Sequence, residues 1–140
     1  MRWQPTLITR LVRVRDVRMR LAEMELSRAD LELAARRQAE QRARAEVETT
    51  TQRSRQEVAE ADQTLLTRQV GGRHGITDWH VARKRAARAV VTAQGQADEA
   101  SSERVDQDLA CSAARRQYRQ MRLDVERMKL LCEGLAGAAE

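Results

Sequence analysis

GGRHG, at residues 71–75, lies near the middle of the 140-residue chain and decides the fold. It holds three of the six glycines, and glycine readily takes the left-handed conformations that end helices. Directly after it, Thr77 suits an N-cap, and Ile76 and Val81 occupy the positions of a hydrophobic staple. The stretch predicts a turn over about 70–76 between two helices. The alternative is a kink in one continuous helix.

Downstream of this turn, apolar residues recur at alternating intervals of three and four. Fifteen of the eighteen positions in the series are apolar, a pattern typical of a coiled-coil seam. The series predicts a helix over about 77–135. Its members are Ile76, Trp79, Arg83, Ala86, Val90, Ala93, Ala97, Ala100, Arg104, Gln107, Cys111, Ala114, Tyr118, Met121, Val125, Met128, Cys132 and Leu135.

Upstream of the turn, the apolar pattern is less regular. One register holds Leu7, Val14, Val17, Leu21, Met24, Leu31 and Ala35, and the stripe then drifts through Ala39, Ala43, Val47, Val58, Ala61 and Leu65. Such a discontinuity predicts locally looser supercoiling. Pro5 suits the first turn of a helix. We expect this helix over about 5–69.

Together, the two patterns predict an all-α protein whose residues 1–140 form a single long antiparallel two-helix coiled-coil hairpin. Folding at the turn pairs positions whose numbers sum to about 146, which places Leu21 near Val125 and Met24 near Met121. The composition agrees, because aromatic residues make up 2% and charged residues 34% of the chain. Disorder of the isolated chain is the alternative, since two helices have little core.

Charge is distributed unevenly along this expected hairpin. Residues 1–20 hold six Arg and one Asp, and residues 67–90 hold six basic residues and one Asp. Residues 21–66 and 91–114 hold more acidic than basic residues. Two basic ends indicate contacts with a partner at each end. The alternative is chance clustering on a solvated helix surface.

Trp79 is the main candidate anchor near the turn. It closes the hairpin as a seam residue or binds a partner, because Trp with Arg neighbours is typical of interface hot spots. Near the termini, Arg side chains dominate, and Arg pairs with carboxylates and phosphates in bidentate fashion. Acidic protein surfaces fit this chain better than nucleic acid, because its net charge is only +5 and few aromatics are available for stacking.

Catalytic and metal-binding sets are not evident. The spacing of His74, Asp78 and His80 fits no common metal site, and no Ser or Cys has a credible base partner. Cys111 and Cys132 lie 21 residues apart on one expected helix, too far for a disulfide, and are expected to be small seam residues. We expect no enzyme activity, cofactor or small-molecule substrate. Without an apolar span or signal peptide, a cytoplasmic location is expected.

The whole layout resembles the YscO/FliJ (SctO) stalk proteins of type III secretion and flagellar export. The resemblance includes the start Leu7–Ile8–Leu11–Val14–Arg15, the nearly equal helices and the central Gly turn. It implies that the end with the termini enters the pore of a hexameric export ATPase and promotes its activity. It also implies that the turn contacts the cytoplasmic domain of the export gate. Some members bind secretion chaperones.

Carried over to this chain, the resemblance assigns residues to each contact. The ATPase-binding residues would be Arg10, Arg13, Arg18, Arg119 and Arg122, and the gate-binding residues would be Ile76, Trp79, His80 and Arg83. Association with the membrane, and any role in virulence, would come through these partners only. The alternatives are a generic coiled-coil scaffold or secretion-chaperone adaptor that dimerises through its seam, and a basic nucleic-acid-binding helical protein.

Overall fold

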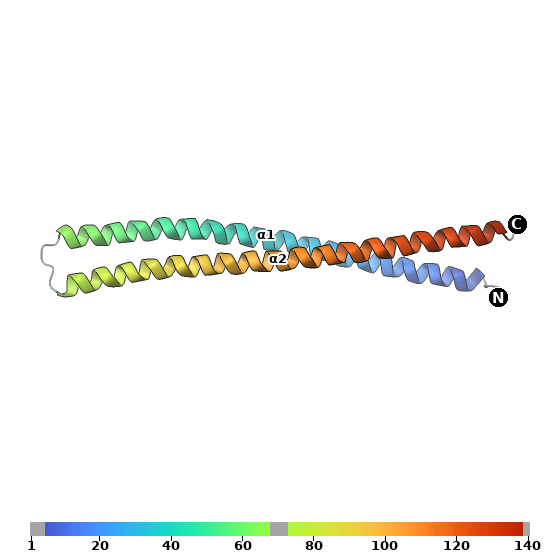
Figure 1. Cartoon of the computed structure of the whole chain (residues 1–140), viewed down its shortest axis with the longest axis horizontal. Helices are drawn as coiled ribbons and strands as arrows, with labels where there is room; N and C mark the ends of the chain where they lie inside the picture. The colour runs from blue at the N-terminus through green and yellow to red at the C-terminus, as the bar shows by residue number, and fades with distance from the viewer. Residues whose placement is uncertain (1–4, 68–72, 139–140) are drawn as a thin grey trace. The chain divides into compact units, whose positions relative to one another are not determined.

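The computed structural model describes residues 5–67 and 73–138, and all of them are helical. Helix α1 spans Pro5–Thr67 and α2 spans Arg73–Ala138, and the two pack against each other as an antiparallel hairpin (Figure 1). The predicted all-α hairpin is therefore confirmed. Contacts divide it into unit 1, which comprises Met1–Ala34 and Asp106–Glu140, and unit 2, which comprises Ala35–Val105.

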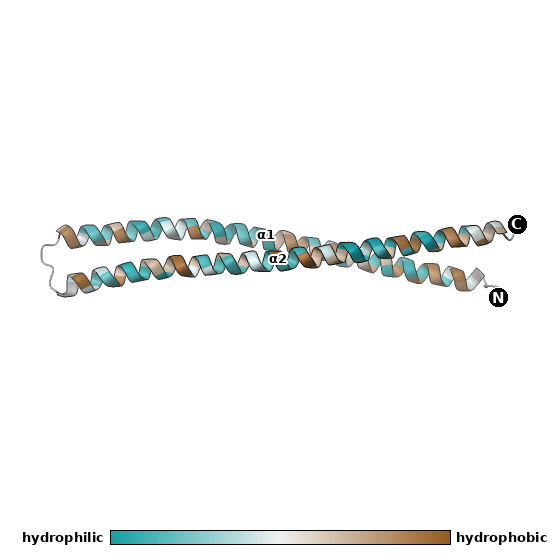
Figure 2. Ribbon diagram, viewed as in Figure 1, coloured by the Kyte–Doolittle hydropathy of each residue, from teal (hydrophilic) through white to brown (hydrophobic). Residues whose placement is uncertain are grey.

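Both helices alternate polar and apolar residues along their length (Figure 2). The only proline occupies the first position of α1, where its missing N–H costs no helical hydrogen bond. In the described parts of the chain, neither helix has a stretch apolar and long enough to cross a bilayer.

Part of the predicted turn is helical. α2 begins at Arg73, so the assignment of residues 73–76 to the turn and of the N-cap to Thr77 is wrong, while residues 70–72 lie outside the described residues. Among the described residues no glycine has a positive φ, and Gly75 is an ordinary helical residue whose added Cβ would meet Leu65 at 3.9 Å. Gly71 and Gly72 lie outside the described residues, as does Trp3.

The seam of α1 uses a different register from the one expected. Leu7, Val14, Val17, Leu21, Met24 and Leu31 are all exposed, so their assignment to the seam is wrong. A neighbouring series with the same three-four spacing is buried or half-buried instead. It comprises Ile8, Val12, Arg15, Met19, Ala22, Leu26, Ala29, Leu33, Arg36, Glu40, Ala43, Val47, Thr50, Ser54, Val58, Ala61 and Leu65.

The seam of α2 agrees with the expected series over most of its length. Every predicted position from Ala86 to Cys132 is buried or half-buried, whereas Ile76, Arg83 and Leu135 are exposed. Ala82 takes the place that Arg83 was expected to fill. The three-four pattern therefore located this seam correctly except at its two ends.

The pairing of the helices is shifted by about six residues from the expected one. Ser54 donates a hydrogen bond to the backbone of Ala86, and Cys111 donates one to the backbone of Ala29. The residue numbers of both pairs sum to 140. Leu21 accordingly lies beside Met121 in a shared groove, and the predicted pairing with Val125 is wrong.

Ion pairs join α1 and α2 within unit 2. Glu40 forms ion pairs with Arg104 and, at 2.5 Å, with Arg44 of its own helix. Arg36 Nη1 lies 2.7 Å from Glu103 Oε2. Charged side chains therefore pair across the seam of unit 2.

Candidate partner-binding surfaces

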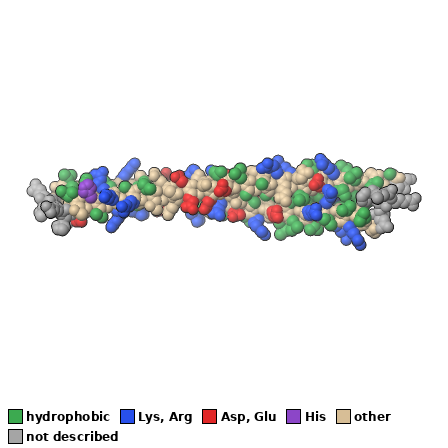
Figure 3. Space-filling model, turned by 60° about the horizontal axis from the view of Figure 1, so that its bottom comes forward, with side chains coloured by type: hydrophobic (Ala, Val, Ile, Leu, Met, Phe, Trp, Pro, Cys, Tyr) green, Lys and Arg blue, Asp and Glu red, His purple; other side chains and the backbone are tan. Residues whose placement is uncertain are grey.

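Arginines are prominent on the exposed surface of unit 1. Arg10, Arg13 and Arg18 are exposed on α1, and Arg119 and Arg122 are exposed on α2. Figure 3 shows Lys and Arg side chains interspersed with hydrophobic ones over the part of the molecule next to the termini. The five residues assigned to an ATPase contact are thus accessible.

These five arginines do not form one cluster. Arg18 lines a groove of about 300 Å³ with Gln117 and Met121, and these α2 residues are close in sequence to Arg119 and Arg122. Arg10 lies eight residues before Arg18, about 12 Å along the helix at 1.5 Å per residue. Arg122 Nε lies 3.5 Å from Glu126 Oε1, which offsets part of its charge. The basic surface is therefore spread along the helices.

Trp79 is the centre of a polar cluster in unit 2. Its ring is half-buried, and its indole Nε1 donates a hydrogen bond of 2.6 Å to Asp62 Oδ1 of α1. The Arg83 guanidinium carbon lies 4.9 Å from the ring centroid, and the His80 ring packs edge-on at 4.9 Å. Because Arg83 follows Trp79 by one turn of α2, it can stack on the indole.

This geometry is compatible with both interpretations of Trp79, as a seam residue and as a partner-binding anchor. The Asp62 hydrogen bond fixes the indole against α1, as a seam residue requires, while Arg83 and His80 remain exposed beside it. Ile76, one turn earlier, is also exposed. Three of the four residues assigned to the gate contact are therefore brought together, and Ile76 is close to them in the helix.

Asp62 is the residue of this cluster that the sequence reasoning missed. A pairing sum of about 146 would place Trp79 near Leu66, whereas Trp79 bonds to Asp62 and Leu65 lies near Gly75. An acidic residue of α1 that reaches Trp79 could have been found only with the correct register. The error in the turn position therefore hid it.

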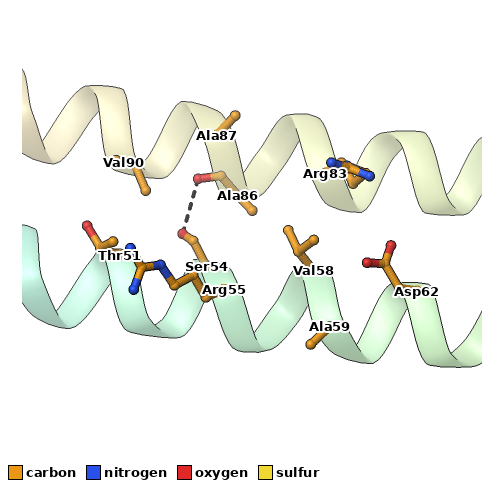
Figure 4. Close-up of a pocket in the computed structure, with 10 residues that line it drawn as sticks. All are labelled: Thr51, Ser54, Arg55, Val58, Ala59, Asp62, Arg83, Ala86, Ala87 and Val90. Atoms are coloured by element: carbon orange, nitrogen blue, oxygen red, sulfur yellow. Dashed lines mark hydrogen bonds between the residues drawn. The ribbon is translucent and has the colours of Figure 1, made fainter.

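A groove of about 470 Å³ lies next to this cluster in unit 2 (Figure 4). Ser54 Oγ donates a hydrogen bond of 3.1 Å to the Ala86 carbonyl oxygen within it. Its lining consists mostly of small residues, with Asp62 and Arg83 also contributing. The lining residues are Thr51, Ser54, Arg55, Val58, Ala59, Asp62, Arg83, Ala86, Ala87 and Val90.

The groove coincides with an interruption of the seam in both helices. The seam advances by two successive steps of four residues from Thr50 to Val58, and again from Ala82 to Val90. The extra step of four amounts to an insertion of four residues into the seven-residue repeat, and such an insertion locally unwinds a coiled coil. A discontinuity was expected after Ala35, but the seam continues there through Arg36 and Glu40, and the break over Thr50–Val58 begins about four turns beyond Ala35.

The two cysteines differ in environment. Cys111 is fully buried in unit 1, where its Sγ donates to the Ala29 carbonyl oxygen at 3.1 Å. Burial raises the pKa of its thiol above the usual value of 9.0, and the charge of Asp30 adds to the effect. Cys132 is free and half-buried. In the described part of the chain, no group of three or more His, Cys, Asp or Glu side chains could hold a metal ion.

No protein-family model, curated protein or solved structure matches this chain. Functional assignment therefore rests on the exposed basic residues of unit 1 and on the Trp79 cluster of unit 2.

Proposed function

We propose that this chain is the central stalk, or coupling protein, of a type III secretion or flagellar export apparatus. It would link a hexameric export ATPase, which it stimulates, to the cytoplasmic domain of the export gate. It would act in the cytoplasm, without enzyme activity or cofactor of its own, and secretion chaperones would be further partners. One observation carries the proposal: the helical hairpin exposes arginines along both helices of unit 1, which holds the termini, and a separate Trp-Arg-His cluster in unit 2.

The surface of unit 1 supports an ATPase contact. Arg10, Arg13 and Arg18 are exposed on α1, and arginine binds carboxylates in a planar, bidentate manner. An acidic lining in the pore of a hexamer would therefore be recognised by charge as well as by shape.

The Trp79 cluster supports a second, independent contact. A half-buried indole fixed by Asp62 and covered by Arg83 is a rigid anchor, and ordering such a side chain on binding costs little entropy. This cluster would contact the export gate.

The test is an ATPase assay in which the full chain is added to the cognate export ATPase. The wild type should raise the rate, and Arg10→Glu with Arg13→Glu should lower the stimulation about tenfold or more. Two control variants should leave stimulation unchanged. Arg42→Glu reverses the charge of an exposed arginine of α1 in unit 2. Trp79→Ala should in addition weaken binding to the gate domain.

Failure of the wild type both to stimulate the ATPase and to co-purify with it would exclude the stalk function. The alternative, a scaffold or chaperone adaptor that dimerises through its seam, predicts a stable dimer by light scattering with no effect on the ATPase. A nucleic-acid-binding protein would instead bind DNA with a steep loss of affinity as salt is raised.

A further inference from the structure

Helix α1 has a second apolar stripe that the hairpin does not use. We call it the outer stripe, and it consists of Leu7, Val14, Val17, Leu21, Met24 and Leu31. All six are exposed, from 47% for Leu7 to 74% for Leu31. Val17, Met24 and Leu31 each follow a seam residue by five positions, which is about 140° around a helix. These three residues therefore face away from α2, and Leu21, at the edge of the outer stripe, borders the groove beside Met121 of α2.

The outer stripe has the spacing of a coiled-coil seam. With Arg10 and Arg28 it forms an unbroken three-four series over about 36 Å of helix. Single exposed apolar residues are normal, but a contiguous patch marks an interaction site. Two stripes on one helix are what a helix needs when it packs against two neighbours.

The run of large apolar residues lies in unit 1. Continued along α1 into unit 2, the same series is small or polar until Leu66, its last member in α1, and every member is exposed. Its members there are Ala35, Gln38, Arg42, Ala45, Thr49, Gln52, Gln56, Ala59, Gln63 and Leu66. Helix α1 continues through unit 2, but this face of it is mostly small or polar there. The large apolar residues of the outer stripe are therefore a local feature of this face in unit 1.

Charges beside the stripe indicate its occupant. Arg13, Arg18 and Arg20 flank the half from Leu7 to Leu21, Arg10 lies within it, and all four are exposed. Seam-flanking positions select partner helices by opposite charge. A helix that packs on this half would therefore gain from acidic residues at its own flanking positions.

A second copy of this chain fits less well. The stripe reads nearly the same in both directions about Met19, so an antiparallel copy could align the apolar residues. A twofold axis there would, however, bring Arg18 and Arg20 near their own copies and set Arg10 against Arg28, and these like charges repel. The apolar residues permit self-pairing, but the arginines oppose it.

We infer that the outer stripe of α1 docks a third helix, an amphipathic helix of another protein whose apolar stripe is flanked by Asp or Glu. This inference rests on the proposed function, since Arg10, Arg13 and Arg18 are assigned there to the ATPase contact. It specifies the kind of element that those arginines bind.

The experiment uses the full chain and two synthetic peptides of about four heptads. Both have Leu and Ile in the seam, and one carries Glu and the other Lys at the flanking positions. Fluorescence anisotropy should show that the Glu peptide binds and the Lys peptide does not, with affinity falling as salt is raised. Binding of both alike, or of neither, overturns the inference.

Variants locate the binding on the stripe. Val17→Ser with Leu21→Ser should lower affinity for the Glu peptide about tenfold or more. The matched control is Leu109→Ser with Leu123→Ser, which changes two exposed leucines of α2 in the same unit and should not affect binding. Arg13→Glu with Arg20→Glu should transfer the preference to the Lys peptide. Thermal melts by circular dichroism verify that each variant is folded.

Two outcomes separate this inference from the alternatives. If the control variant lowers binding as much as the stripe variant, or if light scattering finds a wild-type dimer that the stripe variant dissociates, the inference is wrong. If the Glu peptide binds as expected while the export ATPase is not stimulated, only the proposed function fails.

Discussion

Unit 1 and unit 2 are built from the same two helices, yet they bury different chemistry. Unit 1 buries Ala22, Leu33, Cys111 and Val125. Unit 2 buries Ala86 and Ala93, but also three polar residues, Glu40, Thr50 and Ser54. One part of the hairpin therefore depends on apolar burial, and the other depends on satisfied polar contacts across a narrow seam.

The polar seam of unit 2 is possible because its groups have partners. Within the described residues, no buried side-chain nitrogen or oxygen lacks a hydrogen-bond partner. Buried polar pairs contribute little net stability, but a shifted pairing would leave them unsatisfied. Unit 1 therefore contributes mainly apolar burial to the hairpin, whereas unit 2 contributes polar contacts that require matched partners.

The largest effect is expected from the core of unit 1. Leu33→Ala should lower the free energy of unfolding by about 2–4 kcal/mol, because Leu33 is 4% exposed and its loss leaves a cavity. Leu31→Ala, two residues away on the outer stripe, should cost less than about 0.5 kcal/mol. Urea unfolding followed by circular dichroism measures both. Equal costs would contradict the observed seam of α1.

A smaller effect is expected from the polar seam of unit 2. Glu40→Ala should cost about 1–3 kcal/mol, because it removes the buried carboxylate that pairs with both Arg44 and Arg104. Replacing both residues, by Glu40→Leu with Arg104→Leu, should recover most of that loss. A double-mutant cycle measures the coupling. If the double variant is the least stable of the variants, the ion pair of Glu40 with Arg104 itself adds to the free energy of unfolding.

The smallest effect concerns the pH dependence of unit 1. The folded state raises the pKa of Cys111 above its unfolded value, so its contribution to stability is fully present below the unfolded pKa. That contribution should be lost as the pH rises through the higher folded pKa. Urea unfolding at a series of alkaline pH values measures the free energy of unfolding of the wild type and of Cys111→Ala. The pH dependence of the difference between them isolates the contribution of the Cys111 thiol.

Thiol labelling provides a second readout of the same residue. At neutral pH, the half-buried Cys132 should react first, and Cys111 should react only as fast as unit 1 opens. Labelling of Cys111 at the rate of Cys132 would contradict its burial in the seam.

Sequence reasoning identified much of each candidate surface but not its geometry. Arg10, Arg13 and Arg18 are exposed as the charge pattern suggested, and Trp79, His80 and Arg83 form a cluster as their i, i+1 and i+4 spacing allows. Asp62 could not be found in this way, because it comes from the other helix. Its contact with Trp79 depends on where the turn lies.

Three-four periodicity predicts that two helices pair through a seam, because that periodicity is a local property of each helix. It does not choose between two stripes of the same period on α1, since both hold large apolar residues. Leu33 and Ala22 form the seam, whereas Leu31 is exposed. The choice depends on contacts with α2, such as the ion pairs of Glu40 with Arg104 and of Arg36 with Glu103, and a pattern local to α1 does not contain those contacts.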